Sequence, residues 1–305
     1  MTEGRKMFGG VMIIFILYAA IFIIFEDYDR KYIKPFNEDS DWHLLYFSIF
    51  VMAGLAFILH KYAKRMDERI SKEQTEKENM IRRELTQNIS HELKTPVASI
   101  LGYTDTILDT PDIPAETMRT FITRTNEQAK RLTALLQDLS TLNQMNYAPE
   151  ILTRERVNVS KIVSDISMET SLQLSRKEMS INNYLPVNII IRGNHSLVYS
   201  IFSNLIDNAI NYAGTGTAID ISAMEKDEHW TFTVKDNGTG IEEQHLKRIF
   251  ERFYRVDKSR SRQLGGTGLG LAIVKNAVLL HHGKIEAMNN TDGKGVSFEF
   301  SLRKR

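Results

Sequence analysis

The chain of 305 residues lacks cysteine entirely, which excludes disulfide bonds, a thiolate metal site and a cysteine nucleophile. It also lacks an excess of charge of either sign, because 39 lysines and arginines face 38 aspartates and glutamates and leave a formal charge of +1. A broad nucleic-acid surface needs a basic excess, so we expect no nucleic-acid partner. The length exceeds what one ordinary core holds and predicts two or three domains.

Two long apolar runs lie near the N-terminus. Residues 8–25 carry no charge, and as a helix they would extend roughly 27 Å, close to the hydrocarbon core of a bilayer. Residues 44–59 form a second, slightly shorter run, and the loop of residues 26–43 between them is acidic. Basic residues flank the outer ends of both runs, so the positive-inside rule predicts two transmembrane helices with both termini cytoplasmic. A cleaved signal peptide is the alternative for the first run, and a buried soluble helix is the alternative for the second.

The segment that follows predicts a helical hairpin. Residues 60–109 read as one long helix, whose first part is either a solvated linker or a two-stranded coiled coil. Prolines within residues 110–114 end it, and residues 115–146 predict a second helix. Its apolar face is too wide for the hairpin to bury alone, so we expect two copies to form a four-helix bundle. That face contains Phe121, Ile122, Leu132, Leu135, Leu136, Leu139 and Leu142.

After Pro149 the pattern changes to alternating strands and helices. It predicts an α+β layer in which helices cover one face of a mixed sheet. The expected helices are residues 160–177, 195–212 and 269–281. The expected strands are residues 180–184, 188–192, 218–224, 230–235, 284–288 and 296–302.

The first long helix carries a candidate phosphate acceptor. Residues 90–96 read Ser-His-Glu-Leu-Lys-Thr-Pro. Imidazole is a good nucleophile toward phosphorus, and a step of four residues places Thr95 beside His91 on one helix face. The segment therefore predicts that His91 accepts a phosphoryl group.

A row of amides marks the helix predicted for residues 195–212. Asn204, Asn208 and Asn211 recur at i, i+4 and i+7, on the face opposite an apolar stripe. Amide oxygens suit a Mg²⁺ ion that keeps phosphate and water ligands. The alternative, taken for this helix alone, is an ordinary solvated polar face.

Two glycine-rich loops follow. Residues 236–240 read Asp-Asn-Gly-Thr-Gly after a predicted strand, which is either a simple turn or a carboxylate placed to accept a hydrogen from a base. Residues 265–270 read Gly-Gly-Thr-Gly-Leu-Gly at the start of a helix, where free N–H groups favour phosphate. Between them, the aromatic and basic residues 250–255 precede a polar run, residues 257–263, that suits a flexible lid.

Other nucleotide-binding signatures are missing from the chain. The sequence contains no Gly-x-x-x-x-Gly-Lys-Ser/Thr loop, its glycine spacing is not that of a dinucleotide fold, and it has no His-Arg-Asp or Asp-Phe-Gly triplet. Each motif that is present is weak alone, whereas their order and joint presence are specific.

From about residue 82 to residue 302 the chain resembles the catalytic core of bacterial sensor histidine kinases of two-component systems. Residues 90–96 match the phosphoacceptor box. Residues 204–212, 236–240, 250–255 and 266–271 match the N, first glycine, F and second glycine boxes. The resemblance implies the ATP-binding sandwich shared with gyrase, heat-shock chaperone and mismatch-repair ATPases. With the membrane spans it predicts a multidomain chain. Its parts are a cytoplasmic N-terminus (1–7), the spans (8–25 and 44–59) around an outer loop (26–43), a linker helix (60–81), an all-α dimerisation and phosphotransfer domain (82–149) and the ATP-binding domain (150–305).

The resemblance also implies roles for individual residues. His91 would take the γ-phosphate of ATP, Glu92 would orient the imidazole as a base, and Thr95 would position a water that hydrolyses the phosphorylated regulator. Asn208 would hold Mg²⁺, and Arg255 would contact the γ-phosphate. The remaining residues implied to line the nucleotide site are Asn204, Asn211, Tyr212, Asp236, Gly238, Gly240, Phe253, Gly266, Thr267, Gly268, Leu269 and Gly270.

The chain departs from the family in three respects. Asn211 stands where many relatives have a lysine, the stretch after the second apolar run is too short for a HAMP relay, and the outer loop is too short for a sensor domain. We therefore expect a homodimeric membrane kinase that phosphorylates a response regulator, dephosphorylates it, and senses within the bilayer or through a partner membrane protein. The alternatives are an ATP-hydrolysing conformational machine and a scaffold with a vestigial ATP fold. An ATP-hydrolysing machine would not explain the motif around His91.

Overall fold

A computed structural model of the chain describes residues 19–33, 42–147, 153–256, 266–291 and 293–304. These residues fall into two compact units, Met1–Glu84 and Leu85–Arg305. The predicted lid at residues 257–263 lies outside the described residues, as do Gly265, Pro149 and residues 8–18 of the first apolar run.

The first unit is helical where it is described. Residues 19–28 form a helix, the π-helical turn η1 spans Asp29–Ile33, and α2 (Trp42–Asp109) begins here and continues into the second unit. The long helix predicted from residue 60 is thus confirmed, and it also takes in the second apolar run. Within the part of the chain that the structure describes, no helix reaches the length and hydropathy that a membrane crossing requires.

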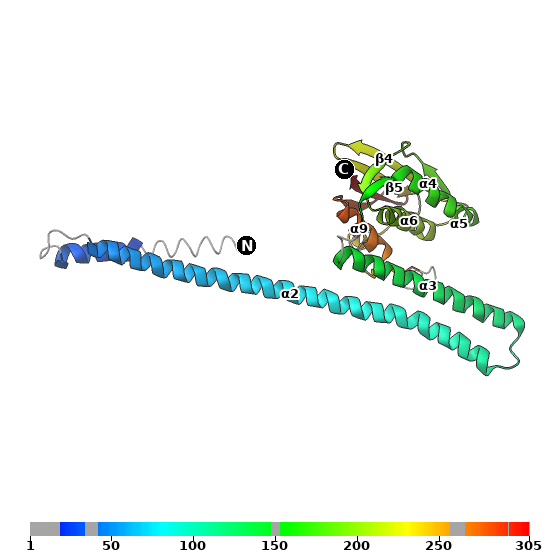
Figure 1. Ribbon diagram of the computed structural model, residues 1–305, viewed down its shortest axis with the longest axis horizontal. Helices are drawn as coiled ribbons and strands as arrows, with labels where there is room; N and C mark the ends of the chain where they lie inside the picture. The colour runs from blue at the N-terminus through cyan, green and yellow to red at the C-terminus, as the bar shows by residue number, and fades with distance from the viewer. Residues whose placement is uncertain (1–18, 34–41, 148–152, 257–265, 292, 305) are drawn as a thin grey trace. The chain divides into compact units, whose positions relative to one another are not determined.

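The predicted hairpin is confirmed in the second unit. The helix α2 ends at Asp109, a turn carries Pro111 and Pro114, and α3 (Ala115–Tyr147) runs back (Figure 1). The rings of Tyr103 and Phe121 stack across the hairpin with centroids 5.5 Å apart. Large apolar side chains of the hairpin remain exposed in this single copy, namely Val97, Leu101, Leu108, Ile122 and Leu136.

The remainder of the second unit is an α+β layer. Its five-stranded sheet has the order β2-β4-β5-β7-β6. The pair β2–β4 is parallel, and the other pairs are antiparallel, which confirms the mixed sheet. The strands of this sheet are β2 (Ser180–Asn183), β4 (Ala218–Lys226), β5 (His229–Asp236), β6 (Ile285–Asn289) and β7 (Val296–Arg303).

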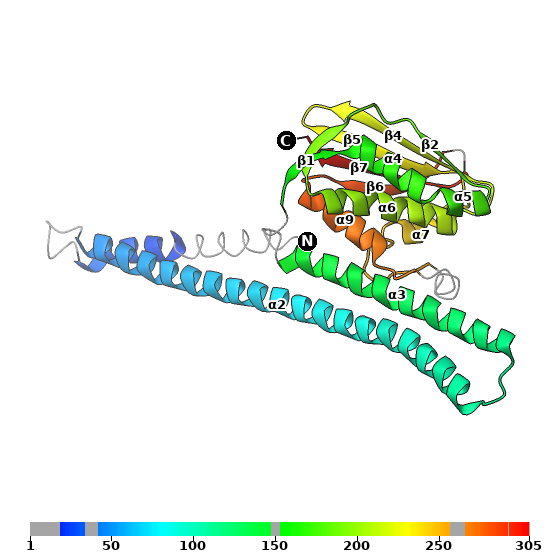
Figure 2. The ribbon, with the colours of Figure 1, turned by 45° about the vertical axis from the view of Figure 1, so that its right-hand side comes forward.

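Helices cover one face of this sheet (Figure 2). They are α4 (Val159–Glu169), α5 (Ser171–Arg176), α6 (His195–Tyr212), the short α7 (Glu243–Leu246) and α9 (Gly270–Leu280). Alternate strand residues point into the core, where Phe202 of α6 meets Phe232 of β5 and Phe300 of β7 with ring centroids 5.4 Å apart in each pair. All three rings are fully buried. Buried residues of both α6 and α9 belong to this core, and these two helices carry the amide row and the end of the second glycine loop.

One local prediction was wrong, and one strand was missed. The single helix expected at residues 160–177 is broken at Thr170, whose hydroxyl donates to the carbonyl of Ile166 at 2.8 Å while α5 starts afresh. A strand was also missed: β1 (Glu155–Asn158) pairs antiparallel with β3 (Ile190–Gly193) in a separate two-stranded sheet. The four residues of β1 contain one apolar side chain, Val157, so no alternation marks this strand in the sequence.

Candidate nucleotide and phosphotransfer site

The candidate phosphate acceptor lies on the surface of α2. The side chain of His91 is exposed, and within the described residues its imidazole makes no hydrogen bond. The hydroxyl of Thr95 donates to the backbone carbonyl of His91 at 3.3 Å, so the two residues share one helix face as predicted. Pro96 is buried inside the helix and removes one backbone donor there. His91 is therefore available to a reactant from solvent.

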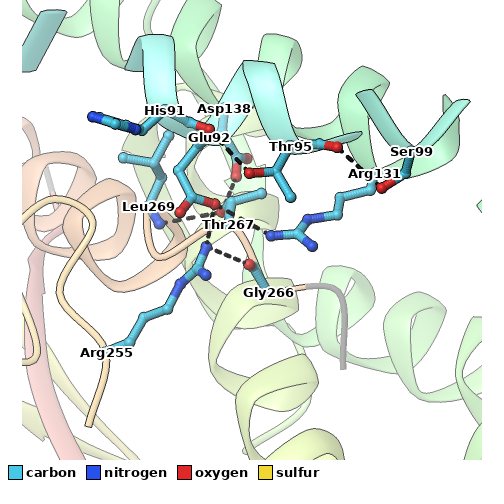
Figure 3. A network of polar contacts seen from close by, with 10 residues as sticks. All are labelled: His91, Glu92, Thr95, Ser99, Arg131, Asp138, Arg255, Gly266, Thr267 and Leu269. Carbon is cyan, nitrogen blue, oxygen red and sulfur yellow. Dashed lines mark hydrogen bonds and ion pairs between the residues drawn. The ribbon is translucent and has the colours of Figure 1, made fainter. Parts of the chain in front are cut away.

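Glu92 points to the opposite side and joins two arginines. Its Oε2 accepts a hydrogen bond from Arg131 of α3 at 3.2 Å and another from Arg255 at 3.0 Å. Figure 3 shows the imidazole of His91 pointing away from this network. The structure thus brings two predicted site residues together, Glu92 and Arg255, although they are far apart in sequence.

Arg255 also holds the second glycine loop. Its guanidinium donates to the carbonyl of Gly266 at 2.7 Å, and the N–H of Phe253 donates to the carbonyl of Gly268 at 2.8 Å. Phe253 has a φ of 61° and Gly268 a φ of 73°, both in the left-handed region that disfavours side chains. A Cβ on Gly268 would lie 3.0 Å from the Cα of Phe253. The predicted arginine segment and the predicted phosphate loop therefore pack directly against each other, and this packing requires a glycine at position 268.

The rest of this loop faces the hairpin. The hydroxyl of Thr267 donates to Oδ2 of Asp138 on α3 at 2.7 Å and accepts from the N–H of Leu269 at 3.1 Å. Burial raises the pKa of Asp138 above its usual range, and the hydrogen bond from Thr267 opposes that shift. Leu269 is fully buried, which fixes the loop to the core just before α9 begins at Gly270.

The amide row on α6 is confirmed in its placement. The opposite stripe of Ile201, Leu205 and Ala209 is buried, as the pattern predicts. The Nδ2 of Asn204 donates to the carbonyl of Ser200 at 2.8 Å, and its Oδ1 lies so close to Gly270 that a Cβ there would meet it at 2.4 Å. The tight approach joins the amide helix to the start of α9.

The next amides along α6 remain available. Asn208 and Asn211 are half-buried, and within the described residues neither side chain makes a hydrogen bond. Tyr212 closes the helix and is 37% exposed. A half-buried amide oxygen without a partner suits a hard cation. The described residues contain no group of three histidine or carboxylate side chains that could form a metal site of their own. The residues present therefore fit a Mg²⁺ ion held mainly by phosphate and water, with Asn208 as a protein ligand.

The first glycine loop is built around Asp236, which ends β5. Its carboxylate is buried, and Oδ1 accepts from the N–H of Gly238 at 2.9 Å and from that of Val296 at 3.4 Å. Burial raises the pKa of Asp236, and these two N–H groups oppose the shift. Oδ2 makes no hydrogen bond with a described residue. One oxygen is thus fixed by the domain, and the other is free to accept a hydrogen from a ligand.

Glycines let the backbone close tightly around this carboxylate. A Cβ on Gly238 would lie 2.5 Å from the Cα of Ala213, next to Tyr212 at the end of α6. Gly240 has a φ of 74° and faces Oδ1 of Asn289, which accepts from the N–H of Ile241 at 2.9 Å. The motif predicted as a pocket is therefore packed against α6 rather than free in solvent.

Four residues of this site were not predicted from the sequence. Arg131 and Asp138 lie on the second hairpin helix, where a charged residue on an amphipathic face gives no sign of its partner. Asn289 is the last residue of β6 and Asn290 follows it, and Nδ2 of Asn290 donates to the carbonyl of Asp236 at 2.7 Å. A polar pair at the end of a strand is the only signal that pointed to them, and turns give the same signal.

Comparisons with known proteins agree with this geometry. Residues 81–147 match the model of the His Kinase A (phospho-acceptor) domain, and residues 193–305 match the model of the Histidine kinase-, DNA gyrase B-, and HSP90-like ATPase family. The hairpin that carries His91 thus matches the first of these families, and the layer that carries both glycine loops matches the second.

Individual relatives and solved structures agree with the family matches. The chain is 35% identical over 72% of its length to the sensor-like histidine kinase SenX3 of Mycolicibacterium smegmatis, covering 57% of that protein. It is 35% identical over 81% of its length to the phosphate regulon sensor protein PhoR of Haemophilus influenzae, again covering 57%. The chain therefore spans somewhat more than half the length of these curated relatives.

The solved structures concern the fold alone. The Acinetobacter baumannii histidine kinase AdeS superposes with a TM-score of 0.59 at 23% identity, over 70% of this chain and 98% of that one. The histidine kinase ThkA, solved in complex with the response regulator protein TrrA, gives a TM-score of 0.59 at 20% identity, over 73% and 61%. The three chains therefore share a fold.

Proposed function

Because this chain belongs to the sensor histidine kinases of bacterial two-component systems, we propose that it transfers the γ-phosphate of ATP to His91. It would then pass the group to an aspartate of a response regulator. The observation that carries the proposal is the bond between Arg255 and Glu92, at 3.0 Å. It joins the loop system expected to hold the triphosphate to the immediate neighbour of the acceptor.

The proposed transfer is a displacement at phosphorus. A nitrogen of His91 attacks the γ-phosphorus and forms a P–N bond, while the bond to the bridging oxygen breaks and ADP leaves with its electron pair. Arg255 stabilises negative charge on the transferring group, and Asp236 fixes the adenine through its second carboxylate oxygen. Mg²⁺, held by Asn208, would supply further charge neutralisation when bound. The phosphoryl group then moves to a carboxylate oxygen of the regulator as the P–N bond breaks.

The proposal is tested by changing the acceptor alone. In His91→Gln, labelled γ-phosphate from ATP should no longer enter the chain as acid-labile, alkali-stable phosphate, while nucleotide binding persists. His60→Gln is the matched control, because it alters another exposed histidine of the same helix and should leave labelling intact. Undiminished label in His91→Gln would reject the assignment. Release of free phosphate without any covalent label would instead favour an ATP-hydrolysing machine.

We also propose that Thr95 supports a phosphatase activity toward the phosphorylated regulator. Its exposed hydroxyl lies one helical turn from His91, where it can orient a water toward an acyl phosphate docked on the hairpin. Thr95→Ala should abolish dephosphorylation of the regulator and leave His91 labelling within about twofold of the original. Equal loss of both activities would show that Thr95 acts through the helix and not through a water.

Assembly as a homodimer is a further part of the proposal. The five exposed apolar side chains of the hairpin are a suitable interface, because burying such residues is worth roughly 1.5–3 kcal/mol each. Leu101→Glu, together with Leu108→Glu, should convert the purified chain to a monomer in light-scattering measurements. An unchanged mass would place the dimer contact elsewhere or remove it.

We further propose that residues 8–25 and 44–59 anchor the chain in the cytoplasmic membrane, with both termini inside. Support comes from the charge pattern and from exposed apolar side chains in the described part of these runs, among them Ile23, Phe50 and Phe57. A chain without cysteine allows single introduced cysteines to report topology. A cysteine in the loop of residues 26–43 should react with a membrane-impermeant maleimide in intact cells, and one at Thr2 should not. The reverse pattern would overturn the orientation.

A further inference from the structure

Two carboxylates of the hairpin meet two groups of the phosphate-end loops. Asp138 of α3 accepts from the hydroxyl of Thr267, and Glu92 of α2 accepts from the guanidinium of Arg255, at 2.7 and 3.0 Å. Both contacts lie in the network of Figure 3. Each joins a hairpin acid to a residue that the family resemblance implies at the nucleotide site, with Arg255 at the γ-phosphate.

The network is enclosed but incompletely satisfied. The side chain of Arg255 is 6% exposed and that of Glu92 is 16% exposed. Within the described residues, Nε of Arg255 is buried and has no hydrogen-bond partner. A buried donor without an acceptor disfavours the arrangement that contains it, so a ligand offering more acceptor oxygens would bind Arg255 better than Glu92 does.

A triphosphate is such a ligand. Carboxylate and phosphate oxygens are equivalent acceptors for a guanidinium and for a hydroxyl at a helix start. The hairpin acids therefore hold the same donors that phosphate would require. Arg131 bonds the same oxygen of Glu92 from α3, at 3.2 Å, and keeps that carboxylate paired when Arg255 leaves it.

We propose that Asp138 and Glu92 stand in for nucleotide phosphate at Thr267 and Arg255, and that Asp138 is a positioning residue that sets the apparent affinity for ATP. Binding of the triphosphate displaces both acids and frees the loops from the hairpin. The inference rests on the proposed function, because it concerns the same ATP. Its consequence is that the hairpin restrains the ATP domain until nucleotide arrives.

The test separates affinity from turnover in the full chain. Asp138→Ala should lower the KM for ATP in His91 labelling roughly five- to tenfold, as expected for removing one charge-assisted competitor, with kcat within about twofold. Asp138→Asn keeps the shape and an acceptor oxygen and should give a smaller decrease. Asp105→Ala, which removes an exposed hairpin carboxylate, should leave both constants unchanged. A KM that stays the same or rises in Asp138→Ala overturns the proposal.

A second measurement covers the case in which Asp138→Ala is poorly folded. Spin labels on cysteines introduced at Thr133 of α3 and Met224 of β4, both exposed, report the separation of hairpin and sheet. Addition of a non-hydrolysable ATP analogue with Mg²⁺ should shift the distance distribution, and an unchanged distribution overturns the proposal. His91 labelling of the unsubstituted chain is measured in parallel. Its absence would reject the proposed function, whereas its presence with an unchanged KM in the variants would reject this inference alone.

Discussion

The two ends of the candidate nucleotide site are held in different ways. At the Asp236 end, every described partner belongs to the α+β layer itself: Gly238, Asn290 and Val296 bond the aspartate, and Gly295 packs on its carbonyl. At the Arg255 end, partners within the layer, such as the carbonyl of Gly266, are joined by two hairpin residues, Glu92 and Asp138. The Asp236 end is therefore held by the layer alone, whereas the Arg255 end is the one at which we propose an exchange of partners. In the proposed function, recognition of the base needs a fixed acceptor, and transfer to His91 needs groups that can be released.

The largest expected effect follows from the fixed end. A Cβ on Gly295 would lie 2.0 Å from the carbonyl oxygen of Asp236, at a φ of 82°, so Gly295→Ala should destabilise the ATP domain by at least about 3 kcal/mol. Gly216→Ala is the matched control, because Gly216 has a φ of 70° but open space around it and should lose only about 1 kcal/mol. Urea unfolding measures both. Similar losses of stability in the two variants would mean that backbone strain, and not close packing on Asp236, determines the stability of this end.

The Arg255 end should determine the rate of phosphoryl transfer to His91. Arg255→Gln removes the guanidinium that we propose faces the transferring phosphoryl group, and it should slow His91 labelling about 100- to 1000-fold, with a far smaller change in the Kd for nucleotide. Arg248→Gln, at a surface arginine paired with Glu251, should have no effect. Equal losses of rate and affinity in Arg255→Gln would remove the distinction between the two ends.

Affinity should depend on the fixed end instead. Asp236→Asn keeps an oxygen for the N–H groups of Gly238 and Val296 but replaces the second acceptor by an amide donor. The Kd for ATP should rise about tenfold or more by isothermal titration. Asp220→Asn, which alters a strand aspartate bonded to Asn182, should leave the Kd unchanged. If Asp236→Asn bound ATP normally, the adenine contact would have to be assigned to another residue.

The smallest expected effect concerns His281, which links the end of α9 to the start of α6. His281 is buried, its Nδ1 donates to the carbonyl of Ala277 at 2.7 Å, and its Nε2 accepts from the N–H of Asn194 at 3.0 Å. Burial lowers its pKa, so the unfolded chain takes up a proton before the folded one. Stability should therefore fall as the pH drops below about 6.5 toward the lower folded pKa, by about 1.4 kcal/mol for each pKa unit between them.

The measurement is urea unfolding at a series of pH values. The difference between the original chain and His281→Gln isolates this histidine, since other titrating groups cancel. His282→Gln, at the exposed neighbour, is the control and should keep the acid sensitivity. Acid sensitivity that survives in His281→Gln would assign it to other groups.

The sequence predicted the fixed and local features more successfully than the exchangeable ones. The amide face of α6, the hairpin with its proline turn and the mixed sheet follow from periodicity and turn chemistry, which act over a few residues. The short strand β1 depends on pairing with the distant strand β3 and was missed. The split of one helix at Thr170 was also missed, although the bond of its hydroxyl to the carbonyl of Ile166 is local.

Long-range pairs between charged groups were the least accessible to sequence reasoning. Glu92 and Arg255 were each predicted as site residues, but nothing in the sequence paired them. Arg131 and Asp138 were not predicted at all, because a charged residue on a helix is usually solvated and its partner is set by the fold. Only the folded structure, in which the hairpin lies against the second glycine loop, brings these residues into contact.

We expect the ATP bound by the α+β layer to phosphorylate the exposed imidazole of His91 on α2. The most direct measurement is to incubate the intact chain with γ-labelled ATP and Mg²⁺ and to map the labelled peptide under conditions that preserve P–N bonds. We predict acid-labile label confined to the peptide that contains His91. Label on any other residue, or hydrolysis of ATP with no label retained by the chain, would contradict the account.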